Sequence, residues 1–476
     1  MTNLAIGYRN RADDALTLYG GSWAAALPLT NLRNRNLGRV ARTSSLALTT
    51  TTFGFTFASA VTFQMIALAG HNLSPSAQVR IRASNEAAAT NYLLKSERLD
   101  DVYWVKSNIT AFTNARLAPD GLVTMTALQE NTTGVVDHYV RSTPFAKPAL
   151  QQYWTASVYL KADQRTFAKV QAIDGVSGTT RMEVVVNLNT GAVVGGVSAF
   201  GTLSDPSCVV TSASNGIWRV QLTALWDAGT TQLTCWVWPM LNSTTASYAG
   251  VVGQGLYAWG AQFEQGAAAS SYIATDTVAV TRAAGQMNSW TTTSDNPSVI
   301  YDAGLGPVWP VSMTADMLED YTRTFINKMP TPITALGWRI DLSDPTNTDG
   351  YVQIGRLFAG ALWSPTRNMA YGASLGWEDN SEVQEALSGA EYFVEKRPYR
   401  VARFTTPQMT IAEGMTSAFD VQRRSGVTGE VVFMFVGDDT TYRLERSFLG
   451  RLRQLSPLEY FNAGVTKAGW EVKELL

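Results

Sequence analysis

The chain has few charged residues and very few residues suited to imidazole or thiolate chemistry. Only 16% of its 476 residues are charged, the net charge is -2, and there are two histidines and two cysteines. Without a block of Lys and Arg, the chain lacks the electrostatic surface needed to bind nucleic acid or an anionic membrane. No window approaches the roughly 18 apolar residues of a membrane span, and the first residues lack the apolar core of a signal peptide. We therefore expect no nucleic-acid partner, no membrane insertion and synthesis in the cytoplasm.

The scarce histidines and cysteines are expected to be structural. His71 lies in the turn HNLS and His138 in the strand-like DHYVRS, so each ring is expected to satisfy local hydrogen bonds. Cys208 and Cys235 are too far apart for a CxxC site. We expect two half-buried thiols on strands, with a disulfide as the alternative. No cofactor and no metal site is predicted.

The acidic residues give no pattern of a catalytic or metal site. A glycoside hydrolase needs two carboxylates facing one cleft, and nothing in the sequence singles out such a pair. The run DLSDPTNTDG, residues 341–350, resembles a calcium loop but lacks the later glutamate and leads into a strand, which favours a plain turn. The chain is therefore predicted not to be an enzyme. The carboxylates weighed in the middle of the chain are Asp100, Asp101, Asp120, Asp174, Glu183 and Glu264.

What the sequence does contain is a succession of short aromatic strands separated by Thr, Ser, Ala and Gly. This texture is typical of mainly β proteins with many turns. The length suggests about two to four domains. We divide the chain into residues 1–90, 91–283, 284–375 and 376–476.

Residues 1–90 are predicted to form part of a β-sandwich. Val79 and Ile81 alternate with Arg80 and Arg82, so we expect an apolar face turned inward and a basic face in water, as at a sandwich edge. Alternation also places three phenylalanines on one face of an earlier strand: Phe53, Phe55 and Phe57.

Residues 91–283 are predicted to form a sandwich or jelly roll, because aromatic strands recur about every ten residues. Exposed rings would suit a glycan-binding surface, whereas alternate rings of a sandwich strand belong to its core. In CWVW, Trp236 and Trp238 share one face, and Cys235 and Val237 share the other. Trp154, Trp218 and Tyr257 are guesses for a glycan site, so the ligand-binding residues stay unassigned.

The C-terminal part is predicted to be α+β. The stretch from Trp338 to Trp363 indicates strand, turn, strand. A helix is expected to begin at Thr410 as N-cap, with Glu413 completing a capping box, and to stop at Gly426. The segment RSFLGRLRQLSPLEYFN indicates either a short helix or a strand and turn. Met415, Ala418 and Phe419 sit at helical spacing.

The middle region ends in the distinctive phrase YAWGAQFEQGAAASSYIATDTVAVTR, preceded by SERLDDVYWVKSN, APDGLVTMTALQEN, TASVYLKAD and NGIWRVQL. On these residues the region resembles the carbohydrate-binding-module-like jelly rolls of tailed-phage tail and fibre proteins. The resemblance implies that the phrase is the last strand and exit of the module. Trp259 and Phe263 would then alternate inward, Gly266 would turn the chain, and Tyr272 and Ile273 would clip the tail onto the sandwich.

The flanking regions resemble a discoidin-like sandwich of phage tail-tip proteins. HNLSPSAQVRIRAS and DLSDPTNTDGYVQIGRLFAGALWSP carry this second resemblance. It implies that the sandwich is discontinuous, formed by residues 1–90 and 284–375, and that the jelly roll is inserted into it. Insertion requires that the two ends of the inserted module lie close together.

These resemblances imply a virion protein of the distal phage tail, at the tail tip, baseplate or fibre base. The expected partners are other tail proteins and further copies of the chain in a trimeric or hexameric ring. A host-surface glycan-binding adhesin is the alternative, in which the jelly roll contacts host glycan. A polysaccharide depolymerase is a remote third reading.

Overall fold

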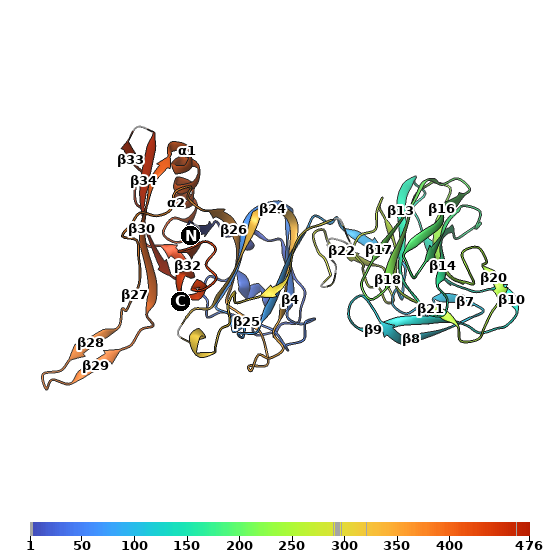
Figure 1. The fold of residues 1–476 in the computed structure, drawn as a ribbon, viewed down its shortest axis with the longest axis horizontal. Helices are drawn as coiled ribbons and strands as arrows, with labels where there is room; N and C mark the ends of the chain where they lie inside the picture. The colour runs from blue at the N-terminus through green and yellow to red at the C-terminus, as the bar shows by residue number, and fades with distance from the viewer. Residues whose placement is uncertain (1–2, 289, 291–295, 297, 320, 463) are drawn as a thin grey trace. The chain divides into compact units, whose positions relative to one another are not determined.

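The computed structural model describes residues 3–288, 290, 296, 298–319, 321–462 and 464–476. Strands account for 51% of the structure and helices for 6%, so the mainly β prediction is confirmed. Two compact units are present: unit 1 comprises Met1–Ala83 and Tyr301–Leu476, and unit 2 comprises Ser84–Ile300. Figure 1 shows both units and their strands. Part of the irregular stretch after residue 284 lies outside the described residues.

Unit 1 is organised around one sheet of 13 strands, ordered β23-β5-β24-β4-β26-β1-β31-β32-β34-β30-β27, with β2 on β4 and β33 on β34. Two small pairs, β3–β25 and β28–β29, stand apart from it. The strand bounds are β1 Ala5–Tyr8, β2 Thr17–Tyr19, β3 Ala41–Arg42, β4 Thr52–Ala69, β5 Gln78–Ser84, β23 Val299–Pro307, β24 Thr324–Ser343, β25 Gln353–Ile354, β26 Arg356–Trp363, β27 Ser374–Glu378, β28 Glu382–Glu385, β29 Glu391–Val394, β30 Tyr399–Thr410, β31 Glu430–Met434, β32 Ser447–Leu452, β33 Glu459–Asn462 and β34 Val465–Glu474.

The first strands of unit 1 confirm one expectation and correct another. The three phenylalanines of β4 are buried together in the core with Val79 and Ile81 of β5. Arg82, expected in water, is fully buried and pairs with Asp341 of β24. The prediction of an edge was wrong because β5 lies between β23 and β24 in the sheet. The neighbouring strand β24 brings Asp341 to Arg82, which gives the buried guanidinium a carboxylate partner.

One continuous helical segment follows β30: α1 (Ile411–Glu413), a π-turn (Gly414–Ala418) and α2 (Phe419–Ser425). Thr410 is its N-cap and accepts a hydrogen bond from the backbone N–H of Glu413, as predicted. The capping box is not reciprocal, because the Glu413 carboxylate accepts from the backbone of Thr366 instead. Gly426 ends the segment with φ 53°. The remaining helical elements are α3 (Arg443–Arg446) and 3-10 turns at Ala12–Asp14, Leu29–Arg33 and Asp316–Leu318.

Two further predictions for the C-terminal part can be compared with the observed strands. The stretch from Trp338 to Trp363 is strand, turn, strand, as expected, with β24 and β26 on either side. The segment RSFLGRLRQLSPLEYFN contains β32 and β33, so the strand-and-turn alternative holds. Among the described residues, no helix is both long and apolar enough to cross a membrane.

Unit 2 has two main antiparallel sheets, and its larger hydrophobic cluster takes residues from both. One sheet has the order β16-β15-β14-β19-β11-β7 with β12 on β19, and the other has the order β17-β18-β13-β21-β9-β8; β10–β20 and β6–β22 are separate pairs. The bounds are β6 Ala89–Asn91, β7 Trp104–Ser107, β8 Ile109–Leu117, β9 Val123–Glu130, β10 Val135–Asp137, β11 Tyr139–Ser142, β12 Phe145–Ala146, β13 Gln152–Ala162, β14 Phe167–Asp174, β15 Arg181–Asn187, β16 Ala192–Phe200, β17 Ser204–Ser212, β18 Ile217–Trp226, β19 Gln232–Met240, β20 Ser247–Ala249, β21 Gly255–Gln265 and β22 Val280–Arg282.

Strand β21 changes its inward face halfway along. Its pairing with β13 shifts register between Ser157 and Tyr159, opposite Gly260, whose φ is +60°. Phe263 therefore packs in the core between the sheets, whereas Trp259 packs in a second cluster with Tyr159. The expectation that Trp259 and Phe263 share one inward face was wrong, because a bulge adds one residue and inverts the alternation.

The tail after β21 is clipped onto the sandwich as expected. Tyr272 is buried against Trp259, with ring centroids 4.6 Å apart, and Ile273 is also buried. The Ile273 N–H donates to the side chain of Gln262 at 2.7 Å.

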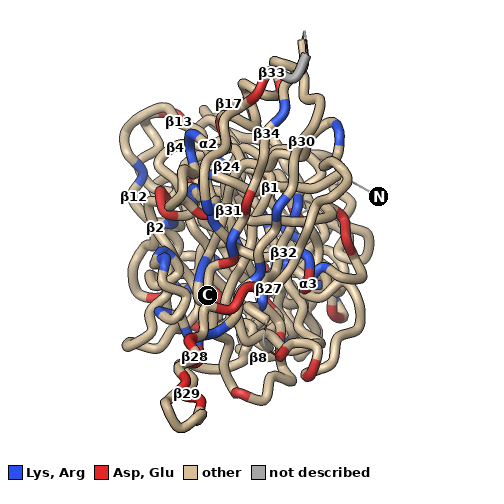
Figure 2. Tube along the Cα trace, turned by 90° about the vertical axis from the view of Figure 1, so that its left-hand side faces the viewer, with Lys and Arg blue, Asp and Glu red and all other residues tan. Residues whose placement is uncertain are grey.

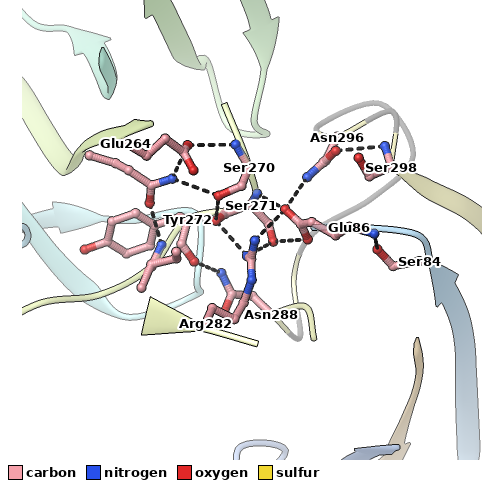
Figure 3. A network of polar contacts seen from close by, with 12 residues as sticks. Ser84, Glu86, Glu264, Ser270, Ser271, Tyr272, Arg282, Asn288, Asn296 and Ser298 are labelled. Atoms are coloured by element: carbon pink, nitrogen blue, oxygen red, sulfur yellow. Dashed lines mark hydrogen bonds and ion pairs between the residues drawn. The ribbon is translucent and has the colours of Figure 1, made fainter. Parts of the chain in front are cut away.

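The two ends of unit 2 are held together by a buried polar network (Figure 3). Glu86 accepts hydrogen bonds from the Ser271 hydroxyl at 2.7 Å and from the Asn296 amide at 2.8 Å. Arg282 lies 2.7 Å from the Glu86 carboxylate and donates to the backbone oxygen of Ser271. Strand β6 also pairs with β22. The beginning and the end of this unit therefore lie side by side.

Replacing Gly260 with alanine is expected to destabilise unit 2 by about 1–3 kcal/mol, because the added Cβ would combine a left-handed backbone with crowding. It would meet the Tyr159 ring at 2.9 Å. Gly178→Ala is the matched control, since Gly178 has φ +69° but open space around it. Chemical denaturation measures both; equal losses would contradict a packing role for Gly260.

Candidate functional site

The outer face of the sheet containing β19 carries an aromatic surface. Along β19, Cys235 and Val237 are fully buried in the core, while Trp236 and Trp238 point to the other face. Trp236 is half-buried and Trp238 is 8% exposed. The predicted division of this strand into two faces is confirmed.

Tyr139 of the neighbouring strand β11 completes this surface. Its ring centroid lies 4.6 Å from that of Trp236 and 4.7 Å from that of Trp238. The two indole rings are nearly parallel, 14° apart, at 5.9 Å. These three rings form a contiguous set, which we call the aromatic platform.

Charged side chains border the platform on both sides. Arg141 lies 5.4 Å from the centre of the Trp236 ring, and the Lys169 ammonium lies 4.0 Å from the centre of Trp238. Partial burial lowers the pKa of Lys169, against the opposing effect of Glu183 and Asp137. Cations over ring faces hold both partners in place.

The half-buried rings of the platform, Trp236 and Tyr139, are suited to stacking against a flat ligand, whereas Trp238 is 8% exposed and lies under the Lys169 ammonium. The C–H faces of sugar rings pack on aromatic rings, and polar groups at the border can bind hydroxyl or acidic groups. The indole N–H groups of Trp236 and Trp238 have no hydrogen-bond partner among the described residues, but both nitrogens are buried. Contact would therefore be made through ring surfaces.

The three residues suggested for a glycan site are not brought together in the structure. Trp154 is fully buried in the core between the sheets. Trp218 is half-buried, and its indole donates to the Leu188 carbonyl at 2.9 Å. Tyr257 packs with the Trp259 cluster instead of the main core. Tyr139 was missed because only the pairing of β11 with β19 brings it to Trp236.

Apart from the platform, unit 2 has a hollow beside β6 and β13 with a volume of about 530 Å³. Tyr92 and Tyr153 line it together with Gln152 and Thr281. The Gln152 side-chain oxygen is buried without a partner among the described residues. This hollow combines rings with amides but carries no charged side chain in its lining.

Both histidines have structural surroundings. His71 is buried; its Nδ1 accepts from the Leu73 N–H at 3.2 Å, and its ring packs on Trp309 at 5.5 Å. Burial and the nearby Arg323 lower the pKa of His71 to about 3. The His138 ring lies between two backbone carbonyls, those of Asn108 and Tyr248.

The six carboxylates considered as catalytic candidates accept hydrogen bonds from nearby residues. The Asp174 side chain accepts from Val176 and Ser177 in its own turn, and buried Glu264 accepts from Ser270 and Gln262. The others pair similarly: Asp100 with Arg98, Asp101 with the Tyr103 N–H, Asp120 with the Leu122 N–H, and Glu183 with Gln171.

The loop that resembles a calcium site is held by its own contacts. Asp344 accepts from the Ser74 backbone and from Asn347, while Asp349 accepts from Asn72. In the part of the chain that the structure describes, no group of three or more His, Cys, Asp or Glu is placed to hold a metal ion.

The cysteines are free, so the disulfide alternative is excluded. Cys208 is partly exposed and Cys235 is fully buried, which corrects the expectation of two half-buried thiols. Burial raises the pKa of Cys208 to about 11 and that of Cys235 to about 12.

The comparisons with known proteins are negative for this chain. Neither a scan of protein-family models nor a search of curated proteins finds a match.

Proposed function

We propose that the chain is a structural component of the distal end of a phage tail. In this proposal unit 1 contains a discontinuous discoidin-like sandwich and an α+β C-terminal part, residues 376–476, which together join the tail. Unit 2 is an inserted carbohydrate-binding-module-like jelly roll that faces the host. The observation that carries the proposal is the division into two units, with unit 1 built from both ends of the chain. The closure of unit 2 at Glu86 and Arg282 supports insertion. The proposal assigns the chain no reaction.

Immunogold electron microscopy tests this role. Antibodies against the chain should label purified particles of the phage that encodes it at the tail end away from the head. An amber mutation in its gene should yield particles with incomplete tail tips. Chain present in the lysate but missing from purified particles, or reducing sugar released from host polysaccharide by the pure chain, would overturn the proposal.

A second candidate function is binding of a host-surface glycan, and the aromatic platform favours it. Three rings from two strands lie on one face of unit 2, with Arg141 and Lys169 at their border. Such a surface stacks on sugars weakly, so several copies must act together for firm attachment.

Alanine at Trp236 and Tyr139 is expected to reduce the binding of multimerised full-length chain to host cells by about 10-fold or more, since aromatic anchors carry most of such binding energy. Phe112→Ala is the control, because Phe112 is an exposed ring of β8, on the other sheet. Tyr153→Ala tests the hollow beside β6 and β13 independently of the platform, because Tyr153 lines that hollow. Flow cytometry with free host glycan as competitor measures the effect; an unchanged platform variant would exclude this surface.

A further inference from the structure

One hairpin of unit 1 stands apart from the sheets. Among the described strands, β28 and β29 pair only with each other, and every residue of both is exposed. Figure 1 shows the hairpin extending away from the rest of unit 1. An isolated two-stranded hairpin is marginally stable in water, so a second surface is needed to hold it. We call residues 382–395 the arm.

The arm is apolar and acidic at once. On one face Val383 lies opposite Phe393, and the two side chains are 59% and 60% exposed. On the same face, nearer the tip, Glu385 lies directly opposite Glu391. Like charges in a cross-strand pair repel each other, so a positive charge on another molecule would stabilise this pair. Figure 2 shows acidic positions along the arm. Further exposed apolar residues are Leu387, Tyr392 and Val394.

The helical segment of unit 1 has an apolar stripe on its outer side. Ile411, Met415 and Phe419 follow one another four residues apart and are 41%, 42% and 49% exposed. Helical spacing groups Met415 and Phe419 with Ala418, but of these three Ala418 alone is buried in the core, together with Val421. An amphipathic helix usually turns a polar side to water. A second apolar side indicates a surface that another chain covers.

Basic residues follow the apolar stripe along the helical segment. Arg423 lies four residues after Phe419, and its side chain is 59% exposed. Arg423 and Arg424 share one acid, Asp420. Partial burial and then the positive charges of Arg424 and Arg11 lower the pKa of Arg9 nearby. The stripe therefore runs from apolar to basic, as the arm runs from apolar to acidic.

The arm cannot reach the stripe of its own chain. β30 begins at Tyr399, just after the arm, and ends at Thr410, the N-cap of the helical segment. Its 12 residues separate the two by about 40 Å at roughly 3.3 Å per residue. In Figure 1 the arm points away from α1 and α2. Contact between them therefore requires two molecules.

We propose that the arm of one copy docks on the helical stripe of a second copy of this chain. Val383 and Phe393 cover Ile411, Met415 and Phe419, while Glu385 and Glu391 approach Arg423 and Arg424. Because the two surfaces differ, the contact is head-to-tail and produces a closed ring or an open chain of copies. The inference rests on unit 1 alone and holds whether or not the chain belongs to a virion.

Sedimentation velocity of the full chain tests the contact. Wild type should form assemblies larger than a dimer as its concentration rises. The arm variant Val383→Ser/Phe393→Ser and the stripe variant Met415→Ser/Phe419→Ser should each weaken self-association by about 10-fold or more. Their equimolar mixture should give a heterodimer, since one intact arm meets one intact stripe. The control Val135→Ser/Val251→Ser changes two exposed apolar residues of unit 2 and should leave assembly unchanged.

Charge exchange gives a second readout that a folding defect would not imitate. Arg423→Glu and Glu391→Arg should each weaken assembly, and the double variant should recover it. Wild type that stays monomeric at about 100 µM, an arm variant that assembles like wild type, or a mixture without heterodimer would overturn the inference. Wild-type assembly together with absence from phage particles would instead overturn only the proposed virion role.

Discussion

Replacing Arg356 with methionine is expected to lower the stability of unit 1 by about 3–5 kcal/mol, because it leaves the buried Glu430 carboxylate without its cation. The Asp13 carboxylate, whose side chain is 30% exposed, loses the same partner. The Arg356 side chain is fully buried and forms paired bonds of 2.7–2.8 Å with both Asp13 and Glu430. It also donates to the Leu32 carbonyl at 3.1 Å. One guanidinium thus joins the N-terminal segment, β26 and β31.

Hydrogen-exchange mass spectrometry is the appropriate measurement, because it follows peptides of units 1 and 2 separately. Protection should fall in unit 1 and stay unchanged in unit 2. The control is Arg403→Met, since Arg403 is 51% exposed and its ion pairs lie at the surface. Surface pairs contribute about 1 kcal/mol or less. A loss at Arg356 no larger than at Arg403 would contradict the buried-cation argument.

Acidification is expected to destabilise unit 1 through His71, and His71→Asn should remove this dependence. Burial and Arg323 depress the pKa of His71 in the folded chain to about 3, from 6.5 in the unfolded chain. The unfolded state therefore binds a proton first as the pH falls, so stability contributed by the neutral ring is present above pH 6.5 and lost toward pH 3. The loss amounts to about 2 kcal/mol at pH 5, at 1.36 kcal/mol per pH unit.

Asparagine is the informative replacement because its side-chain oxygen can still accept from the Leu73 N–H, as Nδ1 does now. The variant loses the ring contact with Trp309, so its stability at pH 7.5 is lower. Urea unfolding at pH 7.5, 6 and 5 separates the two effects, since only the slope with pH reports on titration. His138→Asn serves as the comparison in unit 2. Equal pH slopes for wild type and His71→Asn in unit 1 would contradict the assignment.

The sequence was informative wherever the determining interactions are local. Alternation along β19 predicted that Cys235 and Val237 share one face and Trp236 and Trp238 the other, because side chains of a strand point to opposite faces in turn. Which face is buried was decided by packing, and it is the face of Cys235 and Val237. Thr410 and Gly426 predicted the limits of the helical segment, since caps act within a single turn. The mainly β composition likewise predicted the class of the fold.

Local reasoning failed where a distant strand or a backbone irregularity decides the environment. Arg82 was placed in water because nothing near it in sequence shows that β24 brings Asp341 to it. Trp259 and Phe263 were placed on one face because alternation cannot reveal the bulge at Gly260. Helical spacing groups Met415, Ala418 and Phe419 on the helical segment, but it cannot show that Ala418 is buried while Met415 and Phe419 are exposed.

By itself, then, the sequence determined the mainly β class, the helix limits and the two faces of β19, all of which depend on neighbours along the chain. Only the tertiary structure decided which faces are covered and which rings meet. Tyr139 joins Trp236 and Trp238 through the pairing of β11 with β19 across nearly a hundred residues. The outward stripe of the helical segment follows from the packing of its other face on unit 1. Such environments depend on contacts between segments far apart in the chain, which no local pattern encodes.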